Sequence, residues 1–181
     1  MQWESWLAKN GTSSLGIWLK FAKKSSGVPS VTKPDAIEAA IANGWIDGQL
    51  NPFNEHFWLV RFTGRGPNSK WSQVNVATAS RLESEGKLTA AGQTEVDRAR
   101  SDGRWQAAYP SASNADVPDD LSEALEAEPG AKAFFVTLTG ANRYSVLYRI
   151  HNTKTAKARA ATISKFVAML AAGKTVYPAK A

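Results

Sequence analysis

Apolar residues alternate with other residues in two short stretches near the start of the chain, and this alternation constrains the fold more than any other feature. It runs through residues 14–24 and again through residues 57–63. A period of two is typical of a β-strand that buries one of its faces. Residues 45–50 are predicted as a further strand between these two. The sequence therefore predicts a small antiparallel sheet near the N-terminus.

Helical spacing dominates the rest of the chain. Predicted helices cover residues 3–9, 35–43, 73–85, 90–101, two segments that open at Pro118 and Pro129, a segment that begins at Asn142, and residues 155–172. Thr32, Ser72, Thr89 and Asn142 are the predicted N-caps. The helix after Pro129 is expected to bury Ala133, Phe134, Val136 and Leu138. The predicted fold class is α+β: a small N-terminal antiparallel sheet with helices, followed by an all-helical C-terminal region.

A segment rich in serine, alanine, asparagine and proline divides the chain. It covers residues 107–117 and is predicted as a linker or a long surface loop. We expect an α+β part over residues 1–106, which holds the candidate cleft. A helical part over residues 118–181 is expected to pack against it.

Composition excludes several classes of protein. The 181 residues include no cysteine, so a disulfide scaffold, a cysteine-based zinc site and a thiol nucleophile are excluded. No run of about 18 apolar residues is present, so no membrane span is expected. The first six residues lack the basic and apolar regions of a secretory signal. A cytoplasmic protein is therefore expected, and its oligomeric state stays open.

Charge is distributed unevenly along the chain. The net charge of +6 combines +3 over residues 1–75, −6 over residues 76–130 and +9 over residues 131–181, where no carboxylate side chain occurs. Such a basic region can attract nucleic acid or another anion. It can equally pair with the acidic middle segment of the same chain, which we favour. Nucleic acid is thus a conceivable partner but not the favoured one.

The stretch from Gly44 to Asn75 is dense in aromatic, cationic and amide side chains. On a strand, Trp45 and Asp47 would point to the same face, where an indole and a carboxylate can form one wall of a ligand site. Partial desolvation would raise the pKa of that carboxyl group. Alternatively, Trp45 belongs to the core and Asp47 pairs with an arginine or a backbone amide.

The second half of this stretch combines cations, glycines and a helix start. Its candidate ligand-binding residues are Arg61, Arg65, Lys70, Trp71, Ser72 and Asn75. Arginine binds phosphate or carboxylate through two parallel hydrogen bonds, and a helix N-terminus offers unpaired amides to anions. The pattern is neither a Walker A motif nor a Rossmann fingerprint. In the alternative interpretation, Ser72 only caps its helix and Arg65 pairs with Asp47.

Neither histidine has metal-ligand spacing. His56 is predicted in a turn and His151 on a helix, with no second histidine or carboxylate placed to share a metal ion. No metal site and no cofactor is therefore expected. The catalytic residues, if the chain is an enzyme, are not identifiable from a motif.

Several ordered blocks resemble the YdeI/OmpD-associated family, whose members are called bacteriocin-protection proteins. The blocks are Gly44-Trp45-Ile46-Asp47-Gly48, Arg61-Phe62-Thr63, Arg65 to Asn75, Leu82 to Gly86, Leu88-Thr89-x-x-Gly92, Asp102-Gly103-Arg104-Trp105, Asn142-Arg143-Tyr144, Lys154, Arg159 and Ile163 to Leu170. Gly64 departs from the bulkier or charged residue expected there. The resemblance implies a small, soluble bacterial protein linked to tolerance of bacteriocins or cationic peptides, and it implies no reaction.

Three functions follow as hypotheses. The first is a non-catalytic module that binds a small anionic ligand in an aromatic and cationic cleft, with Arg65 and Lys70 on the anion. The second is an enzyme in which Asp47 acts as general base and Arg65 stabilises developing charge. The third is nucleic-acid binding through the basic C-terminal helices. We favour the first.

Overall fold

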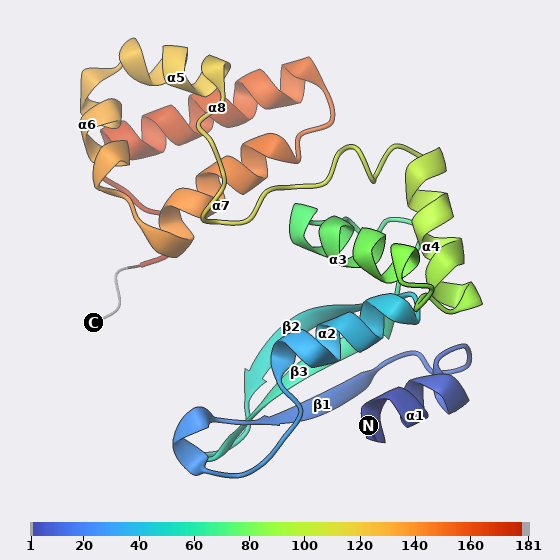
Figure 1. The fold of residues 1–181 in the computed structure, drawn as a ribbon. Helices are drawn as coiled ribbons and strands as arrows, with labels where there is room; N and C mark the ends of the chain where they lie inside the picture. The colour runs from blue at the N-terminus through green and yellow to red at the C-terminus, as the bar shows by residue number, and fades with distance from the viewer. Residues whose placement is uncertain (1, 179–181) are drawn as a thin grey trace. The chain divides into compact units, whose positions relative to one another are not determined.

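The computed structural model describes residues 2–178, and the chain in it forms two units (Figure 1). Unit 1 ends at Ala108 and unit 2 begins at Tyr109. Each unit has its own hydrophobic core.

Unit 1 contains a three-stranded sheet and four α-helices. Its elements are α1 (Gln2–Asn10), β1 (Ile17–Ala22), the short 3-10 helix η1 (Lys24–Ser26), α2 (Lys33–Ala42), β2 (Trp45–Pro52), β3 (Phe57–Gly64), α3 (Gln73–Ser84) and α4 (Ala90–Ser101). The strands are antiparallel in the order β1-β3-β2. The predicted fold class is confirmed. The first strand begins at Ile17 and not at residue 14 as predicted, because Gly16, with a φ of +137°, interrupts the extended backbone just before it.

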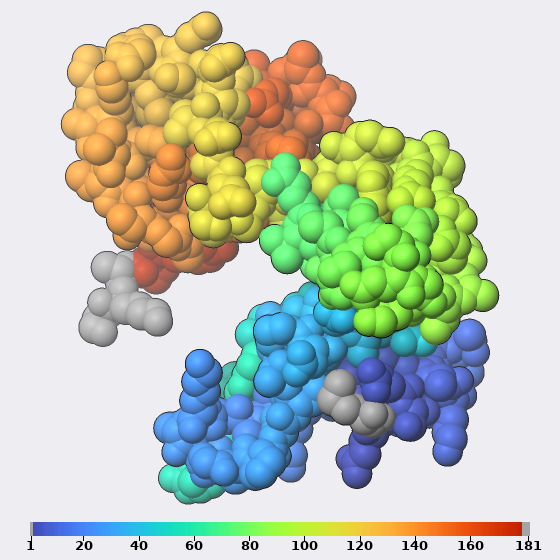
Figure 2. All heavy atoms as spheres, in the orientation of Figure 1, coloured from blue at the N-terminus to red at the C-terminus, as the bar shows by residue number. Residues whose placement is uncertain are grey.

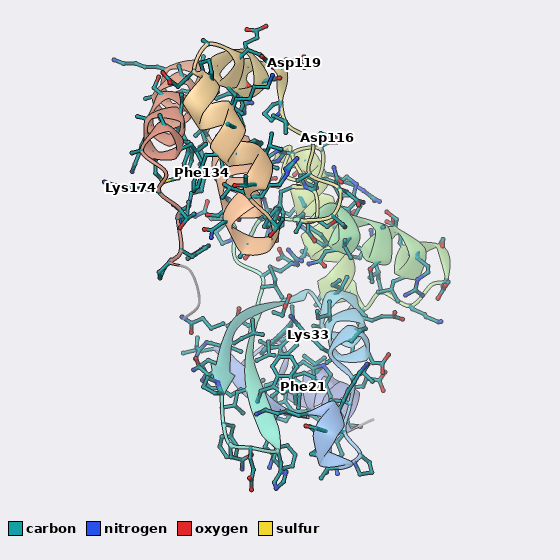
Figure 3. The ribbon with its side chains drawn as sticks, turned by 90° about the vertical axis from the view of Figure 1, so that its left-hand side faces the viewer. Phe21, Lys33, Asp116, Asp119, Phe134 and Lys174 are labelled. Carbon is teal, nitrogen blue, oxygen red and sulfur yellow. The ribbon has the colours of Figure 1, made fainter. Side chains whose placement is uncertain are left out.

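The two faces of the sheet differ in burial. The register pairs Leu19 with Val60 and Ile17 with Phe62, so these side chains share one face. Val60, Phe62 and Phe21 are buried there, beneath residues of α1 and α2 (Figure 3). In β3 the buried Val60 and Phe62 alternate with partly exposed neighbours, which agrees with the predicted strand that buries one of its faces.

A second core cluster joins the helices of unit 1. Ile41 from α2, Leu82 from α3 and Val96 from α4 are buried together with Trp71. Three of the predicted N-caps are confirmed: the hydroxyls of Thr32, Ser72 and Thr89 accept hydrogen bonds from backbone amides three residues ahead. These caps satisfy amides that the helices leave unpaired, which fixes where α2, α3 and α4 begin.

Unit 2 is helical. Its elements are α5 (Asp119–Glu126), α6 (Pro129–Thr137), α7 (Gly140–His151) and α8 (Ala156–Ala171). Leu121, Leu147, Phe166 and Leu170 belong to one buried cluster to which all four helices contribute. In Figure 2 the yellow, orange and red spheres of unit 2 form one closely packed group. Among residues 2–178, none of the helices is long and apolar enough to cross a membrane.

Two predictions for unit 2 are wrong in detail. The buried face of α6 carries Ala131, Phe135 and Leu138, which lie four and three residues apart on one helical stripe, whereas Val136 is 74% exposed. Asn142 does not cap α7, because Thr139 precedes that helix. Asn142 instead accepts a hydrogen bond from the Tyr177 amide at 2.8 Å and donates to its carbonyl at 3.2 Å. It thus fastens the segment that follows α8.

Acid is expected to weaken unit 1 through the Glu83–Arg100 ion pair. The Arg100 guanidinium, 2.6 Å away, and the Gln93 amide lower the pKa of the Glu83 carboxyl from 4.5 to about 2. The unfolded chain binds this proton more readily, so the stabilisation is complete above pH 4.5 and is lost as the pH falls towards 2. Because the carboxylate is 30% exposed, we expect screening to leave about 1 kcal/mol.

Urea unfolding of the wild type and of Glu83→Gln at a series of pH values measures this contribution. The difference in unfolding free energy between the two proteins should shrink as the pH falls from 4.5 to about 2. A difference that stays constant would show that the ion pair does not stabilise the fold.

Candidate functional site

The predicted cleft residues lie in three separate places, of which the first is the core beneath the sheet. Trp45 is only 1% exposed and stands edge-on to Trp6, with ring centres 5.6 Å apart. Its indole nitrogen donates a hydrogen bond to the Gly11 carbonyl at 3.0 Å. Trp45 therefore has the position of a core residue, with its one polar atom satisfied.

The second place is the loop between β3 and α3. The Arg65 guanidinium lies 3.6 Å from the centre of the Trp71 ring, and its Nη1 donates to the Lys70 carbonyl at 3.2 Å. Arg65 is 7% exposed and Trp71 is 2% exposed. The Ser72 hydroxyl accepts from the Asn75 amide at 3.1 Å. Arg65, Lys70, Trp71, Ser72 and Asn75 therefore lie together. However, the Arg65 guanidinium packs directly on the Trp71 ring, and both side chains are buried.

The third place is β2 and β3 themselves. The Asp47 carboxylate lies 3.3 Å from the Lys33 ammonium, at the start of α2. The Arg61 guanidinium lies 5.9 Å from the centre of the Trp18 ring, on the sheet face opposite the core. The two indoles, Trp45 and Trp71, belong to different core clusters. The structure thus does not gather the predicted residues around one opening.

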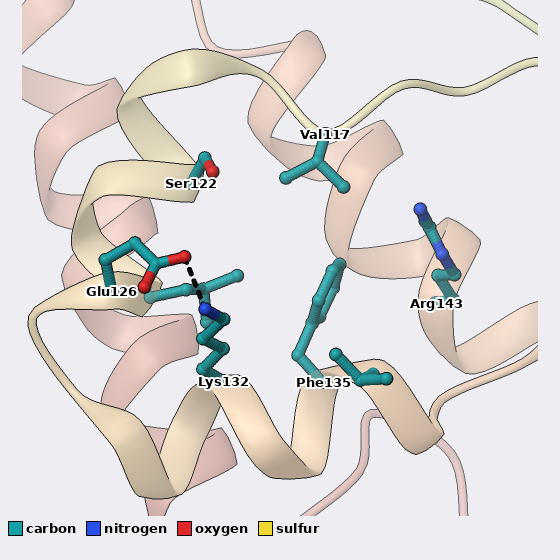
Figure 4. Close-up of a pocket in the computed structure, with 8 residues that line it drawn as sticks. Val117, Ser122, Glu126, Lys132, Phe135 and Arg143 are labelled. Carbon is teal, nitrogen blue, oxygen red and sulfur yellow. Dashed lines mark ion pairs between the residues drawn. The ribbon is translucent and has the colours of Figure 1, made fainter.

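A cavity in unit 2 has more of the properties of a ligand site (Figure 4). It measures about 310 Å³ and lies among α5, α6 and α7. Its lining combines apolar and charged side chains: Val117, Ser122, Leu125, Glu126, Lys132, Phe135, Val136 and Arg143. We call it the Arg143 pocket.

The charges of this pocket are separated by an aromatic ring. Lys132 and Glu126 form an ion pair of 2.6 Å on one side, and Arg143 lies on the other side of Phe135 (Figure 4). The Arg143 guanidinium stands 5.3 Å from the centre of the Phe135 ring. Within residues 2–178, no hydrogen-bond acceptor or carboxylate contacts this guanidinium. Arg143 is therefore held in place by its ring contact, with its donors available.

A second cavity, of about 410 Å³, lies at the end of β1. It combines the aromatic rings of Phe21 and Trp58 with three lysines, Lys23, Lys24 and Lys33. Phe21 and Lys33 are labelled in Figure 3. Lys33 already pairs with Asp47, and the other two lysines are exposed on flexible stems. Because lysines of this kind position a ligand poorly, this cavity is the weaker candidate.

Some of the basic C-terminal side chains pair with the acidic middle segment. Arg159 on α8 holds Asp120 on α5 through two hydrogen bonds of 2.5 and 2.8 Å, and this contact lowers the pKa of the Asp120 carboxyl. Arg159 also donates to the Ile150 carbonyl at 3.0 Å. Lys132 pairs with Glu126 in the same way. The alternative of internal pairing is therefore observed for these two cations.

Sequence reasoning did not select Arg143 as a binding residue, although the residue stands in the block Asn142-Arg143-Tyr144. In the sequence, Arg143 is a cation beside the apolar stripe of a predicted helix. Many solvent-exposed helix positions have the same pattern, so it does not indicate a binding residue. What distinguishes Arg143 is its contact with Phe135 of α6. That contact depends on how two helices pack, which spacing along one helix does not reveal.

The fold divides the chain into an α+β unit and a helical unit, and comparisons with known families agree with this division. Residues 1–95 match a family described as Domain of unknown function (DUF8412). Residues 114–173 match the family described as Bacteriocin-protection, YdeI or OmpD-Associated. The chain therefore belongs to the DUF8412 family and carries a YdeI/OmpD-associated region in unit 2. No curated protein and no solved structure shows significant similarity to it.

The predicted family resemblance is confirmed, with a shift in its extent. Its C-terminal blocks, from Asn142 to Leu170, lie inside the YdeI/OmpD-associated match. Its blocks from Gly44 to Gly92 lie inside the DUF8412 match instead. The Arg143 pocket belongs to the YdeI/OmpD-associated region, since all of its lining residues fall within residues 114–173.

Proposed function

We propose that the chain is a binding protein whose unit 2 takes a small apolar molecule with an anionic group in the Arg143 pocket. The observation that carries this proposal is the Arg143 guanidinium, which lines a cavity beside the apolar side chain of Phe135 and meets no acceptor among the described residues. A partly desolvated cation is favourable only when an acceptor or water replaces its lost hydration. A carboxylate on a ligand can accept two parallel hydrogen bonds from it.

The cavity also restricts the size and chemistry of the ligand. Its volume of about 310 Å³ is at the lower end of the range found for small-molecule sites. Val117, Leu125 and Phe135 offer apolar contacts, and the Lys132–Glu126 pair closes the far side. An aliphatic or aryl carboxylate with a short apolar body satisfies both ends of the pocket. Larger amphipathic molecules would have to leave part of their apolar surface in water.

The family description supplies the biological context for this proposal. It names bacteriocin protection, and we extend that link to this chain. In this interpretation the occupied pocket is part of the protective function, so a bacterial host that depends on the protein for bacteriocin tolerance should lose that tolerance with Arg143→Gln. The enzyme hypothesis finds less support, because Asp47 already pairs with Lys33 at 3.3 Å.

Replacing Arg143 by glutamine is expected to weaken the binding of octanoate at least tenfold. A hydrogen bond to a charged group contributes about 1.5–3 kcal/mol, which corresponds to about tenfold or more in affinity. Titration calorimetry of the full chain with octanoate, and with its neutral amide as the paired probe, measures the effect. The amide should bind the wild type as weakly as octanoate binds the variant.

Arg149→Gln is the matched control, because Arg149 is exposed on the same helix and does not line the pocket. Its affinity for octanoate should equal that of the wild type. Ser122→Phe, which fills the cavity from α5, should abolish binding. Equal affinities for octanoate and its amide, or equal losses in both arginine variants, would refute the proposal.

A further inference from the structure

The outer face of the sheet in unit 1 is open and carries aromatic and cationic side chains. Its residues from β1 and β3 are Trp18, Lys20, Phe57, Leu59, Arg61 and Thr63, and the register places them opposite the core face. All of them are partly or fully exposed, whereas Phe21, Val60 and Phe62 on the other face are buried. No Asp or Glu occurs among these six positions.

The cations of this face rest on its aromatic rings. The Lys20 ammonium lies 4.5 Å from the centre of the Phe57 ring and 5.7 Å from that of Phe53, which is 55% exposed. Arg61 lies over Trp18 in the same manner, at 5.9 Å. Cation–π contacts of this kind hold a positive charge beside a flat apolar surface without neutralising it. The face thus presents ring surface and positive charge together.

The cations of the α3–α4 region differ from those of the sheet face in their partners. Arg81, Lys87, Arg98, Arg100 and Arg104 in the α3–α4 region each pair with a carboxylate. In contrast, Lys20, Lys23, Lys24 and Arg61, on the sheet and at its end, have no carboxylate partner within residues 2–178. The Glu55 carboxylate in the adjacent turn lies 3.2 Å from the His56 imidazole. In the described part of the chain, the open sheet face thus keeps two positive charges without a carboxylate partner, Lys20 and Arg61, and Lys23 and Lys24 add two more at the end of β1.

We infer that this sheet face binds single-stranded nucleic acid. Unpaired bases stack on exposed aromatic rings, and lysine and arginine neutralise the phosphates that follow them. Trp18 and Phe57 lie at positions that the register separates by four residues along β1, or about 13 Å at the usual rise. A flexible strand can contact both rings, whereas a duplex keeps its bases stacked inside. This binding is independent of the Arg143 pocket in unit 2.

Binding of fluorescein-labelled oligothymidylate and oligouridylate to the full chain, measured by anisotropy at several salt concentrations, tests the inference. Trp18→Ala is expected to weaken binding about tenfold, since one base–aromatic stack contributes about 1–3 kcal/mol. The double variant Lys20→Ala/Arg61→Ala should weaken binding at low salt and reduce the slope of log affinity against log salt by about 0.7 for each cation. A duplex of the same sequence should bind less tightly.

Lys157→Ala/Lys165→Ala is the matched control, because it removes two exposed cations from α8 of unit 2. It should leave the affinity unchanged. The absence of binding at low salt, or a loss of affinity in this control equal to that of the sheet variants, would overturn the inference. So would sedimentation showing that the wild type self-associates and that Trp18→Ala restores the monomer, since a second copy would then cover the face. Circular dichroism confirms that each variant is folded.

Discussion

Replacing Trp45 by alanine is expected to lower the free energy of unfolding of unit 1 by about 4 kcal/mol. The side chain is buried against Trp3 and Trp6, and its indole nitrogen bonds the Gly11 carbonyl at 3.0 Å. Its removal leaves a cavity between α1 and the sheet and an unsatisfied carbonyl at Gly11. A loss of this size is a large fraction of the stability of a domain of this length.

The measurement can be confined to unit 1 because all seven tryptophans lie at or before Trp105, and all four tyrosines lie at or after Tyr109. Urea unfolding followed by tryptophan fluorescence therefore reports on unit 1, and the tyrosine signal reports on unit 2. The expected result is a lower unfolding midpoint in tryptophan emission with the tyrosine transition unchanged.

Trp18→Ala provides the comparison for Trp45→Ala, since both remove an indole from the same sheet. Trp18 stands on the open face, where its main contact is Arg61. A loss of about 1 kcal/mol is expected there, well below that for a buried aromatic residue. Similar losses in the two variants would mean that Trp45 is not the core residue described above.

Features that depend on neighbouring residues in the chain are predictable from this sequence, whereas features that depend on packing between elements are not. The alternation over residues 57–63 predicted a strand with one buried face, because side-chain direction along a strand is a local property, and in the structure that face carries Val60 and Phe62. The hydroxyls of Ser72 and Thr89 identified the starts of α3 and α4 for the same reason. For α6, three or four apolar positions fit more than one stripe, and only packing against α5 and α8 selects Phe135 over Val136.

The candidate site shows where local reasoning ends. Spacing on β2 places Trp45 and Asp47 on one face, but it does not show that α1 covers that face at Trp45. Likewise, Arg65 and Trp71 are close in sequence and lie near one loop. The sequence does not show whether a ligand fits between their side chains, and in the structure the guanidinium lies 3.6 Å from the ring centre, which leaves no such space. A buried aromatic core and a ligand cleft have the same residue composition. The distinction rests on whether space remains between the side chains.

Replacing Gly92 by alanine is expected to destabilise unit 1 by about 3 kcal/mol, the second large effect that the structure implies. A methyl group at this position would lie 2.3 Å from the backbone carbonyl oxygen of Ala42, at the close approach of α4 to the end of α2. The Thr89 amide and hydroxyl both bond that same carbonyl, at 2.9 and 3.0 Å, and resist its displacement. The block Leu88-Thr89-x-x-Gly92 thus has a structural explanation.

The sign of the effect makes this prediction decisive. Alanine is favoured over glycine by about 1 kcal/mol in an unhindered helix, so a steric clash must reverse the usual gain. Gly130→Ala in α6 is the control, because its added methyl meets only the Glu128 side chain, at 3.7 Å. Unit 2 should then be unchanged or slightly stabilised when urea unfolding is followed by tyrosine fluorescence. If Gly92→Ala raised the tryptophan-monitored midpoint of unit 1 instead, α4 could not lie so close to α2 that an added methyl group comes within 2.3 Å of the Ala42 carbonyl oxygen.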